Sequence, residues 1–330
     1  MKSQWNGFQS PLADGIQQFL AAKRALGQSF NTEEYALRSF DAFLCQQKIK
    51  TIEDITAELV DDFIASRPRK RPRSYNHLIS VMGRLFSWLT KNYYLDYLPL
   101  RMQPRRETSK RIPFLFTPDM ARDLLACAGN LPDSRRIILR GHTYRTIFAL
   151  LYGLGLRVGE VCRLCLSDVD LNRSLLVIRQ TKFYKSRLVP YGPRMKELLT
   201  GYLRMRLEKF GSPRPEDPLF TLIGGRPINR HTIDRVFSSL VPQMGLKASQ
   251  GVSPPCVHDL RHSFAVGTLL RWYRSGIDPQ TRLLHLSTFL GHVSPTSTAV
   301  YLTITPDLLQ EANLRFEKFA APILQEVLLP

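Results

Sequence analysis

Apolar residues recur at helical spacing through the first hundred positions of the chain. Segments 36–44, 59–64 and 78–89 carry apolar side chains three or four residues apart, and a further helix is predicted over 12–26. Asn31 and Glu34 have the spacing of a capping box before the second of these helices, while Thr56 and Ser74 precede the third and fourth. The pattern predicts a domain of four helices over residues 1–100.

A different pattern follows a polar stretch. Residues 101–112, within "RMQPRRETSKRIP", are basic and flanked by prolines, which is typical of an interdomain linker. Thr117 followed by Pro118 indicates a helix start, and a second domain is predicted over 113–330. Most of it reads as helical, but "SLLVIRQ" (174–180) and "SRLVPYG" (186–192) flank "TKFYK" and predict a β-hairpin. The expected fold class is mainly α, with a small β-hairpin or sheet in the second domain.

Composition and cysteine usage narrow the class of protein. A chain of 330 residues with 44% hydrophobic and 22% charged residues can build two globular domains with cores of their own. No segment has the pattern of a signal peptide or is apolar over enough residues to span a bilayer. The five cysteines are odd in number and scattered. A reducing, cytoplasmic location is therefore expected.

The net charge of the chain indicates what kind of molecule it binds. Lys and Arg number 46 against 28 Asp and Glu, a formal net charge of +18. Such an excess indicates a polyanion, nucleic acid in the first place and an acidic membrane surface in the second. Both predicted domains share the excess, which favours contact of both with the polyanion.

Two segments are candidates for that contact. "RPRKRPRS" lies between the third and fourth predicted helices, and its prolines favour a loop or an extended arm. Its basic side chains are expected on phosphates, although a solvated run is the alternative: Arg69, Lys70, Arg71 and Arg73. The predicted helix 229–240 carries candidates for the major groove: Arg230, His231 and Arg235.

The segment "HDLRH" (258–262) allows two kinds of chemistry. His258 and His262 are four residues apart and share one helix face, a spacing similar to the HExxH pattern of zinc hydrolases. His258 and Arg261 are three apart and also share a face, which suits a phosphate. Asp259 stands where zincins need Glu, and Arg261 would repel a metal cation. A phosphate site is therefore favoured, no metal is expected, and His262 is predicted to pack beside the site or support it.

Other candidate reactive groups are scattered along the second domain, and each alone is weak. They are Arg157 in "GLGLRVGEVCRL", Lys182 in "TKFYK", and His292 with Tyr301 in "LGHVSPTSTAVY". Together with "HDLRH" they are what phosphoryl transfer through a tyrosine nucleophile requires. Guanidinium groups bind the extra negative charge of the phosphorane, cations or a base activate the phenol, and a lysine protonates the leaving oxygen. The cysteines of "CRLC" (162–165) could offer thiolates, but within a helical pattern a buried apolar role is favoured.

The order Arg, hairpin Lys, His-x-x-Arg, Gly-His, Tyr resembles the tyrosine recombinase (phage integrase) family over about the whole chain. The resemblance implies a helical core-binding domain (1–100), a linker (101–112) and a catalytic domain with a C-terminal tail helix (113–330). It also implies a role for each candidate. Arg157, Arg261 and His292 would stabilise the transition state, Lys182 would be the general acid, His258 would exchange protons and Tyr301 would attack. Glu160 resembles the carboxylate that supports the first arginine.

Two features depart from the common family pattern. Gly159 stands where serine is usual, and 31 positions separate Arg261 from His292, several more than in Xer-like chains. The extra residues, near "RWYRSGIDPQTRLLH", are expected to lengthen the helices between the two.

The family resemblance further implies partners. They are double-stranded DNA carrying a recombination site, a homo-tetramer on two duplexes with a dimer at each site, and possible partner recombinases, without cofactor or membrane. A tail with helical spacing is expected to dock on a neighbouring subunit: Leu308, Leu309, Ala312, Phe316, Phe319, Ala320 and Ile323. The reaction expected is site-specific cleavage and rejoining of DNA for integration, excision or transposition. A type IB-like topoisomerase and a catalytically silent DNA-binding regulator of the same fold are the alternatives.

Overall fold

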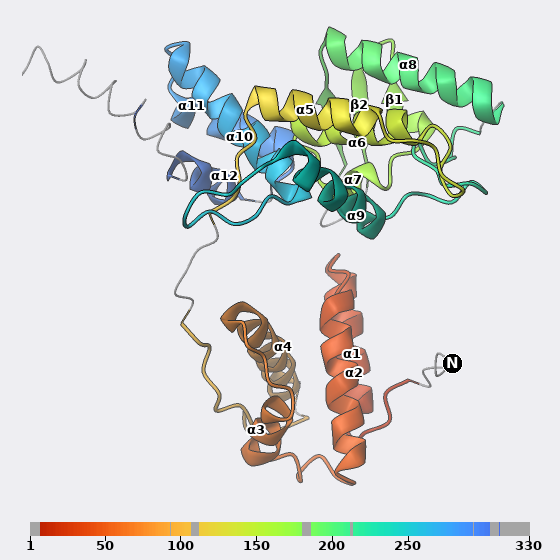
Figure 1. Cartoon of the computed structure of the whole chain (residues 1–330). Helices are drawn as coiled ribbons and strands as arrows, with labels where there is room; N and C mark the ends of the chain where they lie inside the picture. The colour runs from red at the N-terminus through yellow and green to blue at the C-terminus, as the bar shows by residue number, and fades with distance from the viewer. Residues whose placement is uncertain are drawn as a thin grey trace, which may run out of the picture. The chain divides into compact units, whose positions relative to one another are not determined.

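The computed structural model describes residues 7–92, 94–106, 112–179, 186–211, 214–292, 294–303 and 310. The chain divides into two compact units, 1–110 and 111–330. Each has a hydrophobic core of its own, and the two are described separately. In Figure 1 the first unit is drawn in red to orange and the second in yellow to blue.

The first unit is built from four helices, as the apolar spacing predicts. They are α1 (Ala13–Ala25), α2 (Asn31–Gln46), α3 (Ala57–Ala65) and α4 (Pro72–Lys91). Aromatic rings fill the space between them, with the centroids of Phe40 and Phe63 4.9 Å apart and those of Phe40 and Phe86 5.8 Å apart in edge-to-face geometry. Such pairs add to the free energy that burial of the rings already provides.

The helix starts agree with the sequence only in part. Thr56 caps α3 by accepting a hydrogen bond from the Leu59 amide, as predicted. The capping box before α2 is wrong, because Phe30 is the N-cap in the left-handed region and the Glu34 side chain binds Arg24 and Arg38. The start of α4 is also misplaced, because Pro72 occupies its first turn, where a proline loses no hydrogen bond.

The basic segment 67–73 is therefore part loop and part helix. Arg69 and Lys70 lie in the loop, Arg71 is the N-cap of α4, and Arg73 lies in its first turn. Lys70, Arg71 and Arg73 are exposed, whereas Arg69 is half-buried and donates to the Ser74 hydroxyl at 3.0 Å.

Part of the predicted linker is fixed to the first unit. Asn76 on α4 both donates to the Arg105 carbonyl at 2.8 Å and accepts from the Arg105 amide at 2.7 Å. The Arg105 guanidinium lies 4.0 Å from the centroid of the Tyr75 ring and donates to the Arg69 carbonyl at 3.0 Å. The chain between the units therefore leaves the first one after Arg105, later than the predicted boundary at residue 101.

The second unit is also mainly helical. Its longer helices are α5 (Pro118–Gly129), α6 (Arg140–Gly153), α8 (Pro193–Phe210), α9 (Arg230–Leu240), α10 (Val257–Arg274) and α11 (Pro279–Leu290), with short α7 (Val158–Val161) and α12 (Thr296–Ala299). Thr117 caps α5, as predicted. α6 is buried along most of its length and packs against α5, α8 and α10 (Figure 1). A helix with little polar surface is expected at the centre of a domain.

The predicted hairpin is present within a three-stranded antiparallel sheet. β2 (Leu175–Ile178) pairs with β3 (Arg187–Pro190) in the register Leu176 to Val189, and β1 (Val169–Asp170) pairs with β2 on its other side. β1 has only two residues and no alternation that the sequence could reveal. The connection 180–185, which includes Lys182, lies outside the described residues.

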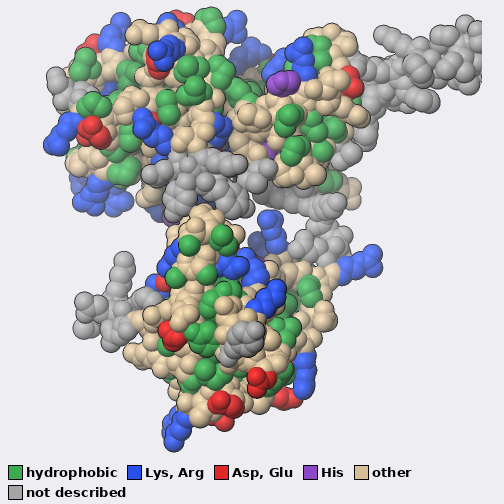
Figure 2. All heavy atoms as spheres, turned by 180° about the vertical axis from the view of Figure 1, so that it is seen from behind, with side chains coloured by type: hydrophobic (Ala, Val, Ile, Leu, Met, Phe, Trp, Pro, Cys, Tyr) green, Lys and Arg blue, Asp and Glu red, His purple; other side chains and the backbone are tan. Residues whose placement is uncertain are grey.

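The C-terminal part of the second unit carries most of the candidate site. The residues that lengthen the interval between Arg261 and His292 fall on the end of α10 and the first half of α11. Beyond the 3-10 turn Val300–Thr303, the predicted tail positions lie outside the described residues. Among the described helices, none combines the length and apolar character needed to cross a bilayer. Figure 2 shows Lys and Arg side chains spread over the visible surface of both units.

Candidate active site

Arg157 is fixed by the turn that begins α7. It is the N-cap of this short helix, and its amide donates to Glu160 Oε2 at 2.9 Å while its guanidinium donates to Glu160 Oε1 at 2.8 Å. The helix ends at Val161, so "CRLC" is not helical throughout, contrary to the sequence interpretation. Cys162 ends α7 and Cys165 precedes the 3-10 turn Leu166–Asp168, both half-buried.

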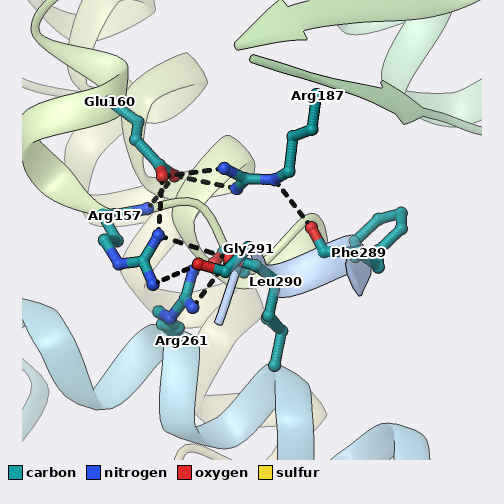
Figure 3. A network of polar contacts seen from close by, with 8 residues as sticks. Arg157, Glu160, Arg187, Arg261, Phe289, Leu290 and Gly291 are labelled. Atoms are coloured by element: carbon teal, nitrogen blue, oxygen red, sulfur yellow. Dashed lines mark hydrogen bonds and ion pairs between the residues drawn. The ribbon is translucent and has the colours of Figure 1, made fainter. Parts of the chain in front are cut away.

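Glu160 binds a second arginine that the sequence analysis did not single out. Arg187 on β3 donates to both carboxylate oxygens of Glu160, at 2.9 and 3.0 Å, and through Nε to the Phe289 carbonyl at 2.9 Å (Figure 3). Burial of Glu160 raises its pKa, but the hydrogen bonds and charge of Arg187, followed by those of Arg157, outweigh this and hold the pKa at about 2.

This low pKa has a consequence for stability. A carboxylate with its pKa depressed from 4.5 in the unfolded chain to about 2 contributes about 3 kcal/mol above pH 4.5 and loses that contribution as the pH falls toward 2. We expect Glu160→Gln to lower the free energy of unfolding at pH 7 by about this amount. The difference in the free energy of unfolding between the variant and the wild type, measured with urea, should shrink to about half by pH 3. A gap that stays constant from pH 7 to pH 3 would contradict the assignment.

Arg261 and Arg157 are oriented by backbone carbonyls at the end of α11. Arg261 is 2% exposed and donates to the carbonyls of Gly155 at 2.6 Å and Leu290 at 2.8 Å. Arg157 donates to the Gly291 carbonyl at 2.8 Å. Figure 3 shows both guanidinium groups meeting at this turn. The negative end of the α11 dipole stabilises cations at that position.

Gly291 is required for this turn. Its φ is +69°, in the left-handed region, and a Cβ built there would lie 2.6 Å from the Arg187 guanidinium. Glycine is the residue that meets both conditions at a helix C-terminus. The "LGH" segment therefore supplies an anchor for the arginines and places His292 directly after it.

Tyr301 lies against Arg261 and two histidines. Its side chain is 4% exposed, its hydroxyl lies 2.9 Å from His262 Nδ1, and the positive charge of Arg261 acts on it. The ring of His292 stacks on that of Tyr301 at 6.3 Å between centroids, and its Nδ1 lies 2.7 Å from the hydroxyl of the buried Thr298. Burial raises the pKa of Tyr301, opposed by the charges of Arg261 and Arg157.

His258 borders a cavity of about 660 Å³ beside these groups. Arg157, Arg163, Arg230 and Asp234 line the same cavity. Burial, followed by the electrostatic effect of His262 and the charges of Arg261 and Arg157, lowers the pKa of His258 to about 4. The pKa of His292 is likewise about 4, lowered by burial and by Arg261 and Arg157. Both imidazoles are therefore neutral at pH 7, in a site whose fixed charge is positive.

The zinc alternative for "HDLRH" has no support in the geometry. Asp259 is 1% exposed, and its carboxylate accepts a hydrogen bond from the Cys256 amide at the start of α10, so it serves as a cap. Within the described parts of the chain, no three His, Cys, Asp or Glu side chains gather as metal ligands would.

The structure brings most predicted site residues together. Arg157, Glu160, Arg261, His292 and Tyr301 form one connected network, and His258 lies against His262 with ring centroids 4.6 Å apart. Of the groove candidates on α9, Arg230 lines the cavity, while His231 and Arg235 are exposed. Lys182 lies outside the described residues. Arg69, Lys70, Arg71 and Arg73 belong to the first unit.

The sequence analysis missed Arg187 and the contact of His262. A single arginine within "SRLVPYG" has no pattern that marks it, because its partner Glu160 lies 27 positions away. For His262 there was a signal: the histidine pair of "HDLRH" places it one turn after His258 on the same face of α10.

Comparisons with known proteins show the family of the chain. Residues 124–307 match the sequence model of the phage integrase family. The putative integrase/recombinase y4rB of Sinorhizobium fredii is 34% identical over 314 residues, covering 94% of this chain and 98% of that protein. The tyrosine recombinase XerD of Chlamydia pneumoniae is 29% identical over 311 residues, covering 93% of this chain and 95% of that protein.

Two solved structures share the fold. The XerH site-specific recombinase bound to its palindromic difH substrate has a TM-score of 0.63 at 18% identity, over 92% of this chain and 84% of that one. The Tn1549 transposon integrase in complex with transposon right end DNA has a TM-score of 0.63 at 17% identity, over 93% of this chain and 99% of that one. The chain belongs to the phage integrase family. Within it, the match to Xer proteins identifies a tyrosine site-specific recombinase, an enzyme of DNA recombination.

Proposed function

We propose that this recombinase cuts and rejoins DNA through a covalent bond between Tyr301 and the 3′ phosphate. The Tyr301 oxygen attacks the scissile phosphate, the bond to the 5′ oxygen breaks, and a free 5′-hydroxyl is released. Rejoining is the reverse, with a 5′-hydroxyl as the attacking group. The covalent link conserves the energy of the phosphodiester, so the reaction uses neither ATP nor a metal, and no cofactor.

The observation that carries the proposal is the contact of Tyr301 with Arg261, in the network that also holds Arg157. A phosphodiester bound by both guanidinium groups would have its phosphorus beside the Tyr301 oxygen. The arginines and His292 would then stabilise the charge that develops on the non-bridging oxygens. Because Arg261 is buried and held by two carbonyls, it needs no reorganisation when substrate binds.

Two residues complete the proton transfers in this scheme. His258 borders the cavity and is neutral at pH 7, so it can exchange protons there. Lys182, on the connection between β2 and β3, is assigned as the acid that protonates the leaving 5′ oxygen. Glu160 orients Arg157, and Arg187 balances the charge of Glu160.

The proposed partner is double-stranded DNA. We propose that Arg230, His231 and Arg235 on α9 contact its major groove, because Arg230 lines the cavity and the other two are exposed on the same helix. Arg69, Lys70, Arg71 and Arg73 would contact phosphates, and three of these four side chains are exposed. The assembly proposed is a homo-tetramer on two duplexes, a dimer at each site, with the C-terminal tail docked on a neighbouring subunit.

The biological task proposed is integration, excision or transposition of a DNA element. The names of related proteins support it: y4rB is a putative integrase/recombinase, and the Tn1549 protein is a transposon integrase. Partner recombinases are a separate part of this proposal, and an assay with one purified protein tests whether they are required.

The experiment is a strand-exchange assay with the purified chain, a chelator, and two labelled duplexes taken from the DNA that flanks its gene. We expect a covalent protein–DNA adduct and product strands that join the two duplexes. Relaxation of supercoiled DNA without joining would instead indicate a topoisomerase, and binding without an adduct would indicate a silent regulator. A requirement for a second recombinase would appear as adduct without exchange.

A further inference from the structure

His262 is the partner of the nucleophile in this structure. Its Nδ1 lies 2.9 Å from the Tyr301 hydroxyl, and the two ring centroids are 5.5 Å apart. His258, to which the acid–base role was assigned, also lies against His262, with ring centroids 4.6 Å apart and the rings at 85°. His262 therefore contacts both His258 and the tyrosine.

The chemistry of the two groups allows one direction that is useful for catalysis. The guanidinium of Arg261 acts on the Tyr301 oxygen as a cation and has only donors, so it cannot accept the phenol proton. The hydroxyl carries one proton that it can donate to a neighbouring acceptor. The nitrogen at 2.9 Å is the acceptor for that proton when His262 carries its hydrogen on Nε2.

We infer that His262 is a catalytic residue, the base that takes the proton of Tyr301 during cleavage and returns it during rejoining. The inference rests on the proposed function. The Tyr301 O–H bond breaks and the proton moves to His262 Nδ1, while the tyrosine oxygen bonds to phosphorus. The bond from phosphorus to the 5′ oxygen breaks, and that oxygen takes a proton from the general acid. In rejoining, the departing Tyr301 oxygen recovers its proton from His262.

The charges of the site couple this step to the substrate. Arg261 and Arg157 lie beside the tyrosine, and the same two arginines disfavour the imidazolium forms of His258 and His292. His262 touches both His258 and Tyr301 and so lies in the same positively charged surroundings. A bound phosphodiester brings a negative charge that offsets the arginines, so the base becomes stronger when the substrate is in place. Deprotonation of Tyr301 is then favoured only beside the phosphate it attacks.

The test compares His262→Ala and His262→Asn in single-turnover adduct formation on a nicked duplex. The Asn oxygen lies near the position of Nδ1 and accepts a hydrogen bond, but an amide does not take a proton. We expect the rate to fall by about 10²- to 10⁴-fold with Ala, the range for a lost general base, and to stay within about tenfold of that value with Asn. His285→Asn, at an exposed position of α11, is the matched control and should leave the rate unchanged.

A second arm separates base catalysis from positioning. Fluorinated tyrosine at position 301 has a more acidic phenol and depends less on a base, so it should restore part of the rate that His262→Ala loses. Full activity of His262→Asn would overturn the inference, because acceptance of a hydrogen bond would then be sufficient. An unchanged or faster His262→Ala would also overturn it, the latter by showing that His262 restrains the tyrosine.

Failure of the inference and failure of the proposed function give different results. If the wild type forms an adduct and His262→Ala forms it equally fast, only the role of His262 is wrong. If the wild type forms no adduct, or Tyr301→Phe forms one, the proposed function itself is wrong. Thermal unfolding and duplex binding of each variant distinguish a lost base from a lost fold, and His262→Asn preserves most of the side-chain volume.

Discussion

Tyr301→Phe is expected to abolish the covalent adduct while the protein still folds and binds DNA. The substitution removes the only oxygen of the side chain that can bond to phosphorus but keeps the ring that stacks on His292. Loss of the hydroxyl removes one hydrogen bond of the half-buried His262, which costs about 1 kcal/mol. The variant should therefore unfold at a somewhat lower temperature and bind a duplex normally.

The measurement uses a duplex with a nick just beyond the cleavage point. The short released fragment diffuses away, so rejoining is prevented and the 3′-phosphotyrosyl adduct accumulates. The wild type should give a band that resists denaturant and disappears with protease, in the presence of a chelator. An adduct in Tyr301→Phe would show that another residue attacks, and an absolute need for a divalent metal would revive the zinc interpretation of "HDLRH".

The second large effect distinguishes the arginines from the lysine. Arg261→Ala should slow cleavage by about 10²- to 10³-fold or more, because a preorganised donor to the developing charge is lost. Lys182→Ala should slow it by about 10²- to 10⁴-fold, because the leaving oxygen has no acid. The two losses are similar in size but differ in cause.

Sulfur in place of the leaving 5′ oxygen separates these causes. A thiol has a pKa near ~8.5 and departs as thiolate without an acid. Lys182→Ala should regain much of its rate on this substrate, whereas Arg261→Ala and Arg157→Ala should not, since they act on the non-bridging oxygens. Rescue of Arg261→Ala, or no rescue of Lys182→Ala, would reverse the assignments. Arg261→Lys is the matched control, because it keeps a cation but loses the two-pronged anchor to Gly155 and Leu290.

Helical spacing predicted the fold class, and motif order predicted most of the residues that the candidate site brings together, for physical reasons. An amphipathic face such as that of α4 is a local property, so the sequence reveals it directly. The reactive residues were recognised because their types and order match one chemistry. The start of α2 was misread because Glu34 binds arginines on either side of it in sequence, Arg24 and Arg38, rather than the helix end.

The remaining features that the sequence analysis did not predict depend on contacts between residues far apart in the chain. β1 exists because two residues pair with β2, and nothing in "VD" itself indicates a strand. Arg187 meets Glu160 only when β3 lies beside α7 and the end of α11, an arrangement that no local pattern encodes. The contact of His262 with Tyr301 likewise joins residues 39 positions apart.

The anchors of Arg157 and Arg261 have a consequence for sequence divergence. Both guanidinium groups are oriented by main-chain carbonyls of Gly155, Leu290 and Gly291. Every amino acid carries such a carbonyl, so the hydrogen bonds to the arginines do not themselves require leucine at position 290, where core packing sets the choice instead. Gly155 and Gly291 are the exceptions, because both have a positive φ and a Cβ would lie 2.5 Å from the Phe264 ring at the first and 2.6 Å from the Arg187 guanidinium at the second. A search for relatives by side-chain identity alone would thus see two arginines and two glycines, while the carbonyl of residue 290, an acceptor for Arg261, makes no demand of its own on the side chain.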